Sequence, residues 1–212
     1  MSKGHDGSRV NQLAAYKQQY VDHFRRRLEL YGEDVRALWN SAASQATRFE
    51  ALCQVSDLSG KTLLEVGSGF GDLLDFLAEK QVVLGAYCGI DLSSEMVAIA
   101  RARHAGARFE CRDLHEQPFG DQTFDVVVGS GLFFLPHALW DAYVGVYVAA
   151  MFACCRRAVA VNFLSAYSTN KDPESYYATP HVVLERLQQQ ITPRVVLRHD
   201  YRGNDFTVYL YR

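Results

Sequence analysis

The pattern of apolar and polar positions divides most of the chain into short strands separated by helices. Apolar runs short enough for buried strands are predicted at 62–66, 86–90, 108–111, 124–129 and 158–164. Between these runs, the spacing of apolar residues predicts helices at 71–80, 93–104 and 138–153. Strands that alternate with helices of this length predict a parallel sheet with right-handed crossovers. A last helix at 180–190 is followed by strands at 194–198 and 206–211, whose short connection predicts an antiparallel hairpin.

The N-terminal part follows a different pattern. Residues 1–9 are polar and are predicted to have no regular structure, whereas 10–31 form an amphipathic helix with an aromatic face. The run Arg25–Arg27 interrupts that face, and it is either a solvated surface or part of a lid. A further helix is predicted at 42–52. We therefore expect a helical lid or extension over 1–58 and an α/β domain over 59–212.

Composition limits the class of protein. The chain has 212 residues, 49% of them hydrophobic and 22% charged, which suits one α/β domain with a small appendage. A formal net charge of −2 gives no basic surface that would favour nucleic acid. Five cysteines without metal-ligand spacing predict a reducing compartment and no metal site. With no apolar run long enough for a membrane span or signal peptide, we expect a cytoplasmic protein.

The most informative stretch is 63–73, in which a predicted strand turns through Gly67, Gly69 and Gly71 into a helix. Glycines let the backbone approach a ligand closely, and the helix N-terminus offers free N–H groups. The dinucleotide fingerprint G-x-G-x-x-G would place its third glycine where Asp72 stands. The spacing therefore indicates a nucleotide-like ligand other than a dinucleotide, or simply a tight turn in another α/β domain.

Two acids flank this turn. Glu65 ends the first strand, and a carboxylate there suits a ligand with an ammonium or sulfonium group. Asp91 closes the second strand, where it is placed to accept hydrogen bonds from ribose hydroxyls. Together, the motifs E-V-G-S-G-F-G and G-I-D-L-S resemble those of the class I, Rossmann-like S-adenosylmethionine-dependent methyltransferases. The resemblance in the order of elements extends from about residue 61 to the C-terminus.

The resemblance implies a seven-stranded, mostly parallel sheet with a C-terminal antiparallel hairpin and helices on both faces. It also implies S-adenosylmethionine as cofactor. An Asp-Leu pair after the third strand resembles the family's adenine contact, and Arg48, ahead of the first strand, would bind the cofactor's carboxylate unless it is an ordinary surface residue. The implied cofactor residues are Arg48, Glu65, Gly67, Ser68, Gly69, Gly71, Asp91, Leu92, Met96, Asp113, Leu114 and Ser130.

Catalytic residues are harder to predict, because methyl transfer from a sulfonium needs positioning more than covalent help. His137 beyond the fourth strand and Tyr167 beyond the fifth are candidates for a base, although His137 could instead cap the following helix. Aromatic residues near the expected mouth could wall an acceptor pocket or belong to the core: Tyr16, Tyr20, Trp39, Phe133, Tyr176 and Tyr177. The long polar segment 165–179 is expected to hang over the same mouth.

Three functions remain open from the sequence. The first is methyl transfer to a small molecule, at O, N or C, by a monomer or homodimer; the chain lacks the Pro-Pro-aromatic signature of enzymes that methylate nucleobase amines or protein glutamine. The second is a protein that binds S-adenosylmethionine without catalysis. The third is an NAD(P)-dependent oxidoreductase, since Tyr167 and Lys171 match the Y-x-x-x-K of short-chain dehydrogenases. That motif must lie on a helix, and the surrounding Thr-Asn-Lys-Asp-Pro is typical of a loop.

Overall fold

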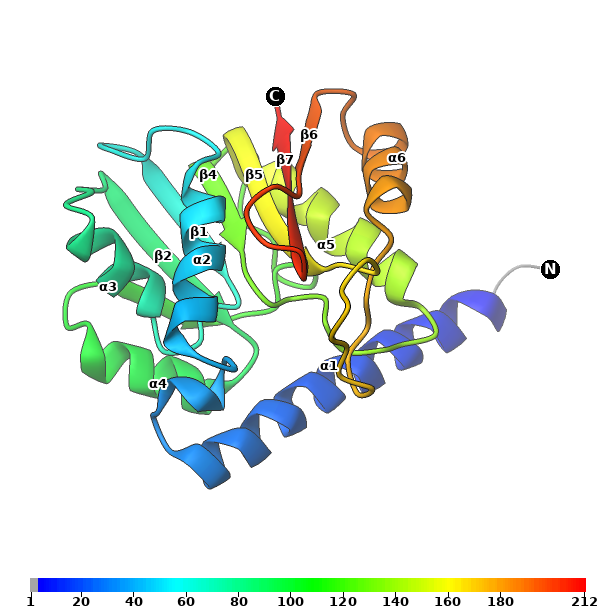
Figure 1. Cartoon of the computed structure of the whole chain (residues 1–212), viewed down its shortest axis with the longest axis horizontal. Coiled ribbons are helices and arrows are strands. Elements are labelled where there is room, and N and C mark those ends of the chain that lie inside the picture. Colours follow the sequence, from blue (N-terminus) through cyan, green and yellow to red (C-terminus); the bar gives the residue numbers. More distant parts are fainter. Residues whose placement is uncertain (1–3) are drawn as a thin grey trace.

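The computed structural model describes residues 4–212, with side chains from residue 12 onward, and is built on one sheet (Figure 1). Strand order is β3-β2-β1-β4-β5-β7-β6, and β1 to β5 run parallel while β7 is antiparallel to both of its neighbours. The predicted fold is thus confirmed. The strands are β1 (Thr62–Val66), β2 (Ala86–Asp91), β3 (Arg108–Cys111), β4 (Phe124–Gly129), β5 (Cys155–Leu164), β6 (Val195–Arg198) and β7 (Asp205–Tyr211).

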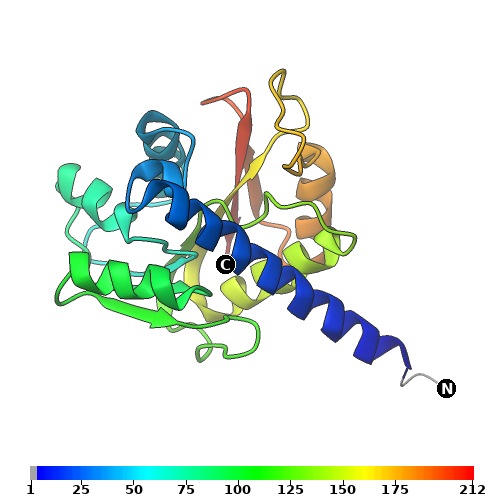
Figure 2. The ribbon, with the colours of Figure 1, turned by 90° about the horizontal axis from the view of Figure 1, so that it is seen from below.

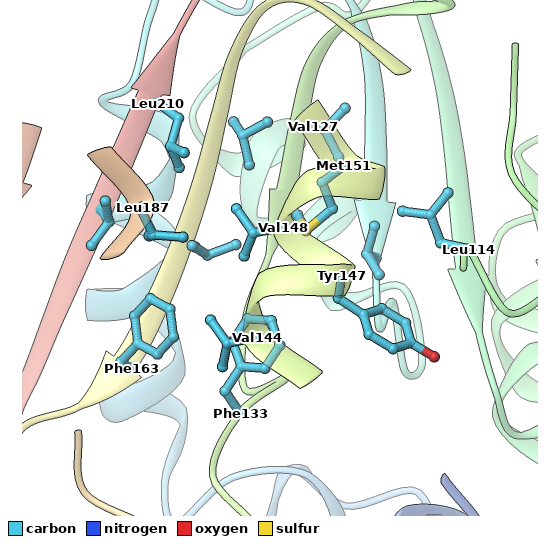
Figure 3. Packing of buried hydrophobic residues seen from close by; sticks show 14 of the residues in the cluster. Leu114, Val127, Phe133, Val144, Tyr147, Val148, Met151, Phe163, Leu187 and Leu210 are labelled. Atoms are coloured by element: carbon cyan, nitrogen blue, oxygen red, sulfur yellow. The ribbon is translucent and has the colours of Figure 1, made fainter. Parts of the chain in front are cut away.

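Helices cover both faces of the sheet because the central strands are apolar on both sides. Val126 and Val128 of β4 pack with α2 (Ala42–Cys53) and α3 (Asp72–Glu79), and α4 (Ser94–Arg103) packs beside β2 and β3. Val127 faces the other way, into the cluster formed with α5 (Trp140–Cys154) and α6 (Pro180–Gln190). Figure 3 shows Val144, Val148 and Met151 of α5 in that cluster. These two apolar layers fix the sheet that carries the site.

Helix α1 (Gly4–Tyr31) crosses the end of the sheet at which the parallel strands finish, as Figures 1 and 2 show. Tyr16 anchors it, since this side chain is fully buried, donates a hydrogen bond to the Leu135 carbonyl at 3.0 Å and meets Tyr143 edge-on. The prediction of no regular structure is wrong for residues 4–9, which are helical; residues 1–3 lie outside the described part. A short 3₁₀ helix (Val35–Ala37) connects α1 to α2.

Two further features differ from, or refine, the predicted organisation. Phe49 and Leu52 of α2 belong to the same core cluster as β1, so the packing is continuous across the expected boundary at residue 58. Residues 165–179 form a loop that a single bridge, Ser165 to Ala178, ties to the end of β5. Tyr167 and Lys171 therefore do not share a helix face. The dehydrogenase interpretation requires that helix, so the structure does not support it.

Candidate functional site

The loop between β1 and α3 brings bare backbone to the end of the sheet. Gly67 and Gly69 have φ values of 72° and 52°, a left-handed conformation that side chains rarely adopt. A Cβ on Gly67 would also lie 2.5 Å from Leu132 Cδ2. The amides of Gly67 and Ser68 donate to the Ile90 carbonyl at 2.8 and 3.0 Å, so the loop is fixed to β2. The turn is therefore held against β2 in a backbone conformation that favours glycine.

Acidic side chains surround this loop. Glu65 is 3% exposed, and burial raises the pKa of its carboxyl well above the ordinary value, with further raising by Asp72 and Asp91 and opposition from a hydrogen bond donated by Tyr87. Asp91 accepts hydrogen bonds from the amides of Gly69 and Ser93, both at 2.9 Å, and burial raises its pKa as well. Buried carboxylates without a counterion make the region favourable for a positively charged ligand.

A cavity of about 220 Å³ opens next to the loop. The polar half of its lining comes from the glycine loop, the ends of β1, β2 and β4, and α2. The aromatic half of its lining comes from α1, the segment before α2 that carries Trp39, the segment after β4, the end of β5 and the 165–179 loop. Its lining includes Tyr20, His23, Phe24, Arg27, Trp39, Gln45, Arg48, Glu65, Gly67, Ser68, Asp72, Asp91, Met96, Ser130, Gly131, Leu132, Phe133, Phe134, Asn162, Phe163, Asp172, Glu174, Tyr177 and Asp205.

The structure brings about half of the predicted cofactor residues to this cavity. Ser68 lines the cavity, and among the described residues its buried Oγ has no hydrogen-bond partner. Gly69, Gly71 and Leu92 lie outside the lining; Gly69 donates to Asp91, and Gly71 precedes α3, against the His104 ring. The predicted residues that line the cavity are Arg48, Glu65, Gly67, Ser68, Asp91, Met96 and Ser130.

The predicted adenine contact is engaged by other groups. The Asp113 carboxylate accepts hydrogen bonds from Lys17 Nζ at 2.6 Å and from Tyr147 Oη at 2.8 Å, and these contacts lower its pKa against the opposing effect of burial. The neighbouring Leu114 is a core residue. Lys17 belongs to α1, so the helix that crosses the mouth holds this carboxylate away from the cavity. The assignment of Asp113 and Leu114 to adenine stays a prediction that requires Lys17 to move.

Arg48 lines the cavity, but its guanidinium is engaged by other residues of the chain. Its Nε and Nη2 donate to Asp205 Oδ1 at 3.0 and 2.7 Å, and its Nη1 donates to Ser44. The guanidinium also lies 5.2 Å from the Trp39 ring centroid. Because Arg48 is already paired with a buried carboxylate, it is a poor receptor for the cofactor's carboxylate. Sequence reasoning missed this because the partner is remote along the chain.

Neither predicted base lies on the cavity. His137 stands against the Tyr16 ring, and its Nδ1 accepts the amide of Leu139 at 3.0 Å in the turn that precedes α5. Tyr167 is 58% exposed and its hydroxyl contacts His181. A contact within the turn before α5 holds His137, and an outward loop position holds Tyr167, so both side chains point away from the cavity. The geometry therefore gives no support to catalysis by His137 or Tyr167.

The predicted acceptor residues divide in the same way. Tyr20, Trp39, Phe133 and Tyr177 line the cavity. Tyr16 is part of the core, and Tyr176 packs on Trp140 with ring centroids 4.3 Å apart, beside a separate small cavity between α5 and α6. Adjacent residues such as Tyr176 and Tyr177 point in different directions, and the presence of aromatic residues in the sequence does not show which of them faces the cavity.

Several lining residues were not predicted. His23 and Phe24 follow Tyr20 at helical spacing, so extension of the aromatic stripe past Tyr20 would have found them. Asn162 at the end of β5 donates to Ser130 Oγ at 2.9 Å and accepts the amide of Gly131 at 3.1 Å, which fixes the segment after β4. An amide side chain within an apolar strand was the signal in the sequence for that role.

The donor set fits S-adenosylmethionine. Buried carboxylates suit its cationic groups, and Gly67 and Ser68 line the cavity beside them. Within residues 4–212 no cluster of side chains has the composition of a metal site, and no helix is long and apolar enough to cross a membrane.

Comparisons with known proteins agree with this geometry. Residues 63–158 match a family model described as a methyltransferase domain. A Mycobacterium tuberculosis protein assigned to the methyltransferases is 31% identical over 153 residues, which cover 68% of this chain and 89% of that protein. The fatty-acid O-methyltransferase of Mycolicibacterium smegmatis is 37% identical over 93 residues, but these span only 43% of this chain and 30% of that enzyme.

Solved structures share the fold at low sequence identity. Magnesium protoporphyrin IX methyltransferase from Synechocystis PCC 6803, solved with bound S-adenosylhomocysteine, has a TM-score of 0.63 at 15% identity and covers 92% of this chain and 99% of its own. The DhpI complex with S-adenosylhomocysteine also has a TM-score of 0.63, at 18% identity, with coverage of 92% and 96%.

Proposed function

Because the chain belongs to the S-adenosylmethionine-dependent methyltransferase family, we propose that it methylates a small molecule bound in the aromatic half of the cavity. The observation that carries the proposal is that one cavity joins Glu65, Gly67 and Asp91 to the aromatic side chains Phe24, Trp39 and Phe134. An acceptor in that half would lie beside the cofactor. Apolar walls with a few polar groups are typical of small-molecule sites.

Relatives support a small acceptor. One relative methylates fatty acids by its name, another from Chlorobaculum parvum is a demethylmenaquinone methyltransferase, 36% identical over 90 residues, and a structural neighbour is named for magnesium protoporphyrin IX. The Chlorobaculum match covers 42% of this chain and 34% of that enzyme, so its substrate is not carried over. What the three names share is a small molecule with a large apolar part.

The residues of the site divide the work. S-adenosylmethionine supplies an activated methyl group on a positively charged sulfur when it is bound. Glu65 and Asp91 provide negative charge and hydrogen-bond acceptors on the polar side, and the Gly67 turn permits close approach. Asn162 fixes the segment after β4 through Ser130 and Gly131. The aromatic side chains exclude water and orient the acceptor, which is the main contribution that a protein makes to methyl transfer.

The test is transfer of label from methyl-labelled S-adenosylmethionine to a panel of small phenols, carboxylic acids, amines and quinols, with protein and nucleic acid mixtures alongside. We expect label in small molecules only, and much less of it with the Asp91→Ala variant at subsaturating S-adenosylmethionine. Label in protein or nucleic acid would refute a small acceptor. Tight binding of S-adenosylhomocysteine without transfer to any substrate class would favour a non-catalytic binder, and NAD binding would favour the oxidoreductase.

We also infer that the protein works in the cytoplasm as a monomer or homodimer and without nucleic acid. Free cysteines at Cys53, Cys88, Cys111, Cys154 and Cys155 suit a reducing compartment, and the net charge of −2 supplies no attraction for phosphates. Light scattering during size exclusion would give the oligomeric state. A retarded band with DNA or RNA would contradict the last inference.

A further inference from the structure

The buried carboxylate near the end of β1 receives a hydrogen bond from a residue outside the cavity. In the register of the sheet Glu65 lies opposite Gly89 of β2, and Tyr87 precedes Gly89 by two positions. Side chains two positions apart on a strand share a face, so Tyr87 is a diagonal neighbour of Glu65. Its hydroxyl donates to Glu65 Oε2 and is the only hydrogen-bond donor to that carboxylate among the described side chains. Glu65 lines the cavity whereas Tyr87 does not, so the tyrosine reaches the carboxylate without occupying space that a ligand needs.

Apolar packing holds Tyr87 in this position. Its ring meets the Phe109 ring of β3 edge-on, with the two centroids 5.5 Å apart. The same ring packs against two apolar clusters, one that contains Leu63 and one that contains Val97. Burial and the neighbouring Glu65 carboxylate raise the pKa of Tyr87 well above its ordinary value, so the hydroxyl stays protonated and remains a donor. One oxygen of Glu65 is thus held by a fixed donor, and the other is left for a ligand.

The other groups that face Glu65 favour its protonated form. Burial raises the pKa of its carboxyl, and Asp72 of α3 and Asp91 of β2 raise it further. From α2 the Cys53 thiol lies near, and burial raises the pKa of this thiol to about 12, so it stays neutral. Only the hydrogen bond from Tyr87 acts on the Glu65 carboxyl in the opposite direction within the described part of the chain.

We propose that Tyr87 is the positioning residue that orients Glu65 and keeps it ionised for the ammonium group of S-adenosylmethionine. The inference rests on the proposed function, since it requires the cofactor in this cavity. An ammonium group forms its strongest hydrogen bonds with an ionised carboxylate, so a proton on Glu65 competes with the ligand. A carboxylate that a fixed donor already orients also loses less freedom when the ligand binds. Tyr87 thus contributes to cofactor affinity without touching the cofactor.

Two ligands that differ in the ammonium group test this role by calorimetry. S-adenosylhomocysteine carries the amino acid part, whereas 5′-methylthioadenosine has the same adenosine and sulfur without it. We expect Tyr87→Phe to bind S-adenosylhomocysteine about tenfold more weakly, near the lower end for one hydrogen bond to an ionised group, and 5′-methylthioadenosine with unchanged affinity. Tyr211→Phe is the matched control, because Tyr211 packs against the same cluster as Leu63 but donates to a carbonyl, that of Val55. Equal weakening of both ligands, or of neither, would overturn the inference.

The pH dependence of binding separates orientation of a charge from simple packing. Because a proton on Glu65 competes with the ammonium group, the affinity for S-adenosylhomocysteine should rise with pH as Glu65 ionises. Loss of the Tyr87 hydroxyl raises the pKa of Glu65, so the same rise should lie at higher pH in Tyr87→Phe. In Glu65→Gln the rise should be absent, and the addition of Tyr87→Phe should then cost less than about threefold in affinity. A rise at the same pH with and without the Tyr87 hydroxyl would refute the role.

Failure of this inference is distinguishable from failure of the proposed function. If S-adenosylhomocysteine does not bind the wild-type protein, the cofactor site fails, and the proposed function fails with it. If it binds the wild-type protein and Tyr87→Phe alike, only the role of Tyr87 fails. Transfer of label to a small molecule would then still support the proposed function.

Discussion

Asp91 gives the sharpest test of the cofactor site, because one carboxylate both holds the glycine loop and faces the cavity. In Asp91→Ala the amides of Gly69 and Ser93 lose their acceptor, and any ligand hydroxyl at the end of β2 loses a charged partner. Hydrogen bonds to charged groups contribute about 1.5–3 kcal/mol. We expect binding of S-adenosylhomocysteine to weaken by about 2–3 kcal/mol, or about 30- to 150-fold in Kd.

The effect on folding should be much smaller. Burial raises the pKa of Asp91, which means that its ionised form is destabilised in the native state, and removal of that form offsets the two lost amide contacts. The variant should therefore lose ligand affinity without losing much stability. Calorimetric titration should show the whole expected loss of affinity for S-adenosylhomocysteine, while the melting temperature should change by a few degrees at most. Asp91→Asn is the control, because its amide oxygen still accepts one hydrogen bond and its loss of affinity should be intermediate.

Unchanged affinity in Asp91→Ala would refute the assignment of ribose recognition to the end of β2. A loss of affinity that tracks an equally large loss of stability would instead mean that Asp91 only holds the loop. Measurement at two ionic strengths adds a check, because hydroxyl contacts to a buried carboxylate should be nearly independent of salt.

Other perturbations test the remaining parts of the site. Lys17→Ala frees the Asp113 carboxylate from a part-buried ion pair and should accelerate association of S-adenosylhomocysteine in stopped-flow experiments, and slower association would mean that the lysine itself contacts the ligand. Asp205→Ala leaves Arg48 buried without its partner and should cost about 3–5 kcal/mol of unfolding free energy by urea titration, whereas a loss below about 1 kcal/mol would show that the pair is solvated. Because folding raises the pKa of Glu65, the folded state binds a proton more tightly than the unfolded chain, so stability is present at low pH and falls as pH rises above about 4.5. Glu65→Gln should reduce that fall in thermal melts of the ligand-free protein, and an unchanged pH profile would contradict the buried charge.

Local signals in the sequence were sufficient for most of the fold. The run Val126–Val128 identified a strand covered on both faces, and the glycine spacing identified the turn where φ is positive. The start of α1 was missed because Gly4 and Gly7 disfavour a helix in isolation. That propensity is weak beside the rest of a helix anchored through Tyr16.

The site was predicted less completely, because it depends on contacts between distant parts of the chain. Arg48 and Asp205 are 157 positions apart, and Lys17 and Asp113 are 96 apart, so no local pattern could pair them. His137 looked chemically suitable but is held in the turn before α5, whereas His23, next to a run of arginines that indicated either a solvated surface or a lid, lines the cavity. The residue types in the sequence indicated which chemistry is possible. Which individual histidine, arginine or aspartate reaches the cavity depends on tertiary packing.

Helix α1 has a kinetic consequence. It is pinned in the core by Tyr16, it holds Asp113 through Lys17 on one side, and Tyr20 donates to the Gly131 carbonyl on the other. One helix thus contacts both sides of the cavity, so the two substrates share a single entrance. We expect Tyr16→Phe, which removes the contact with the Leu135 carbonyl, to change the association rates of S-adenosylhomocysteine and of the acceptor in the same direction.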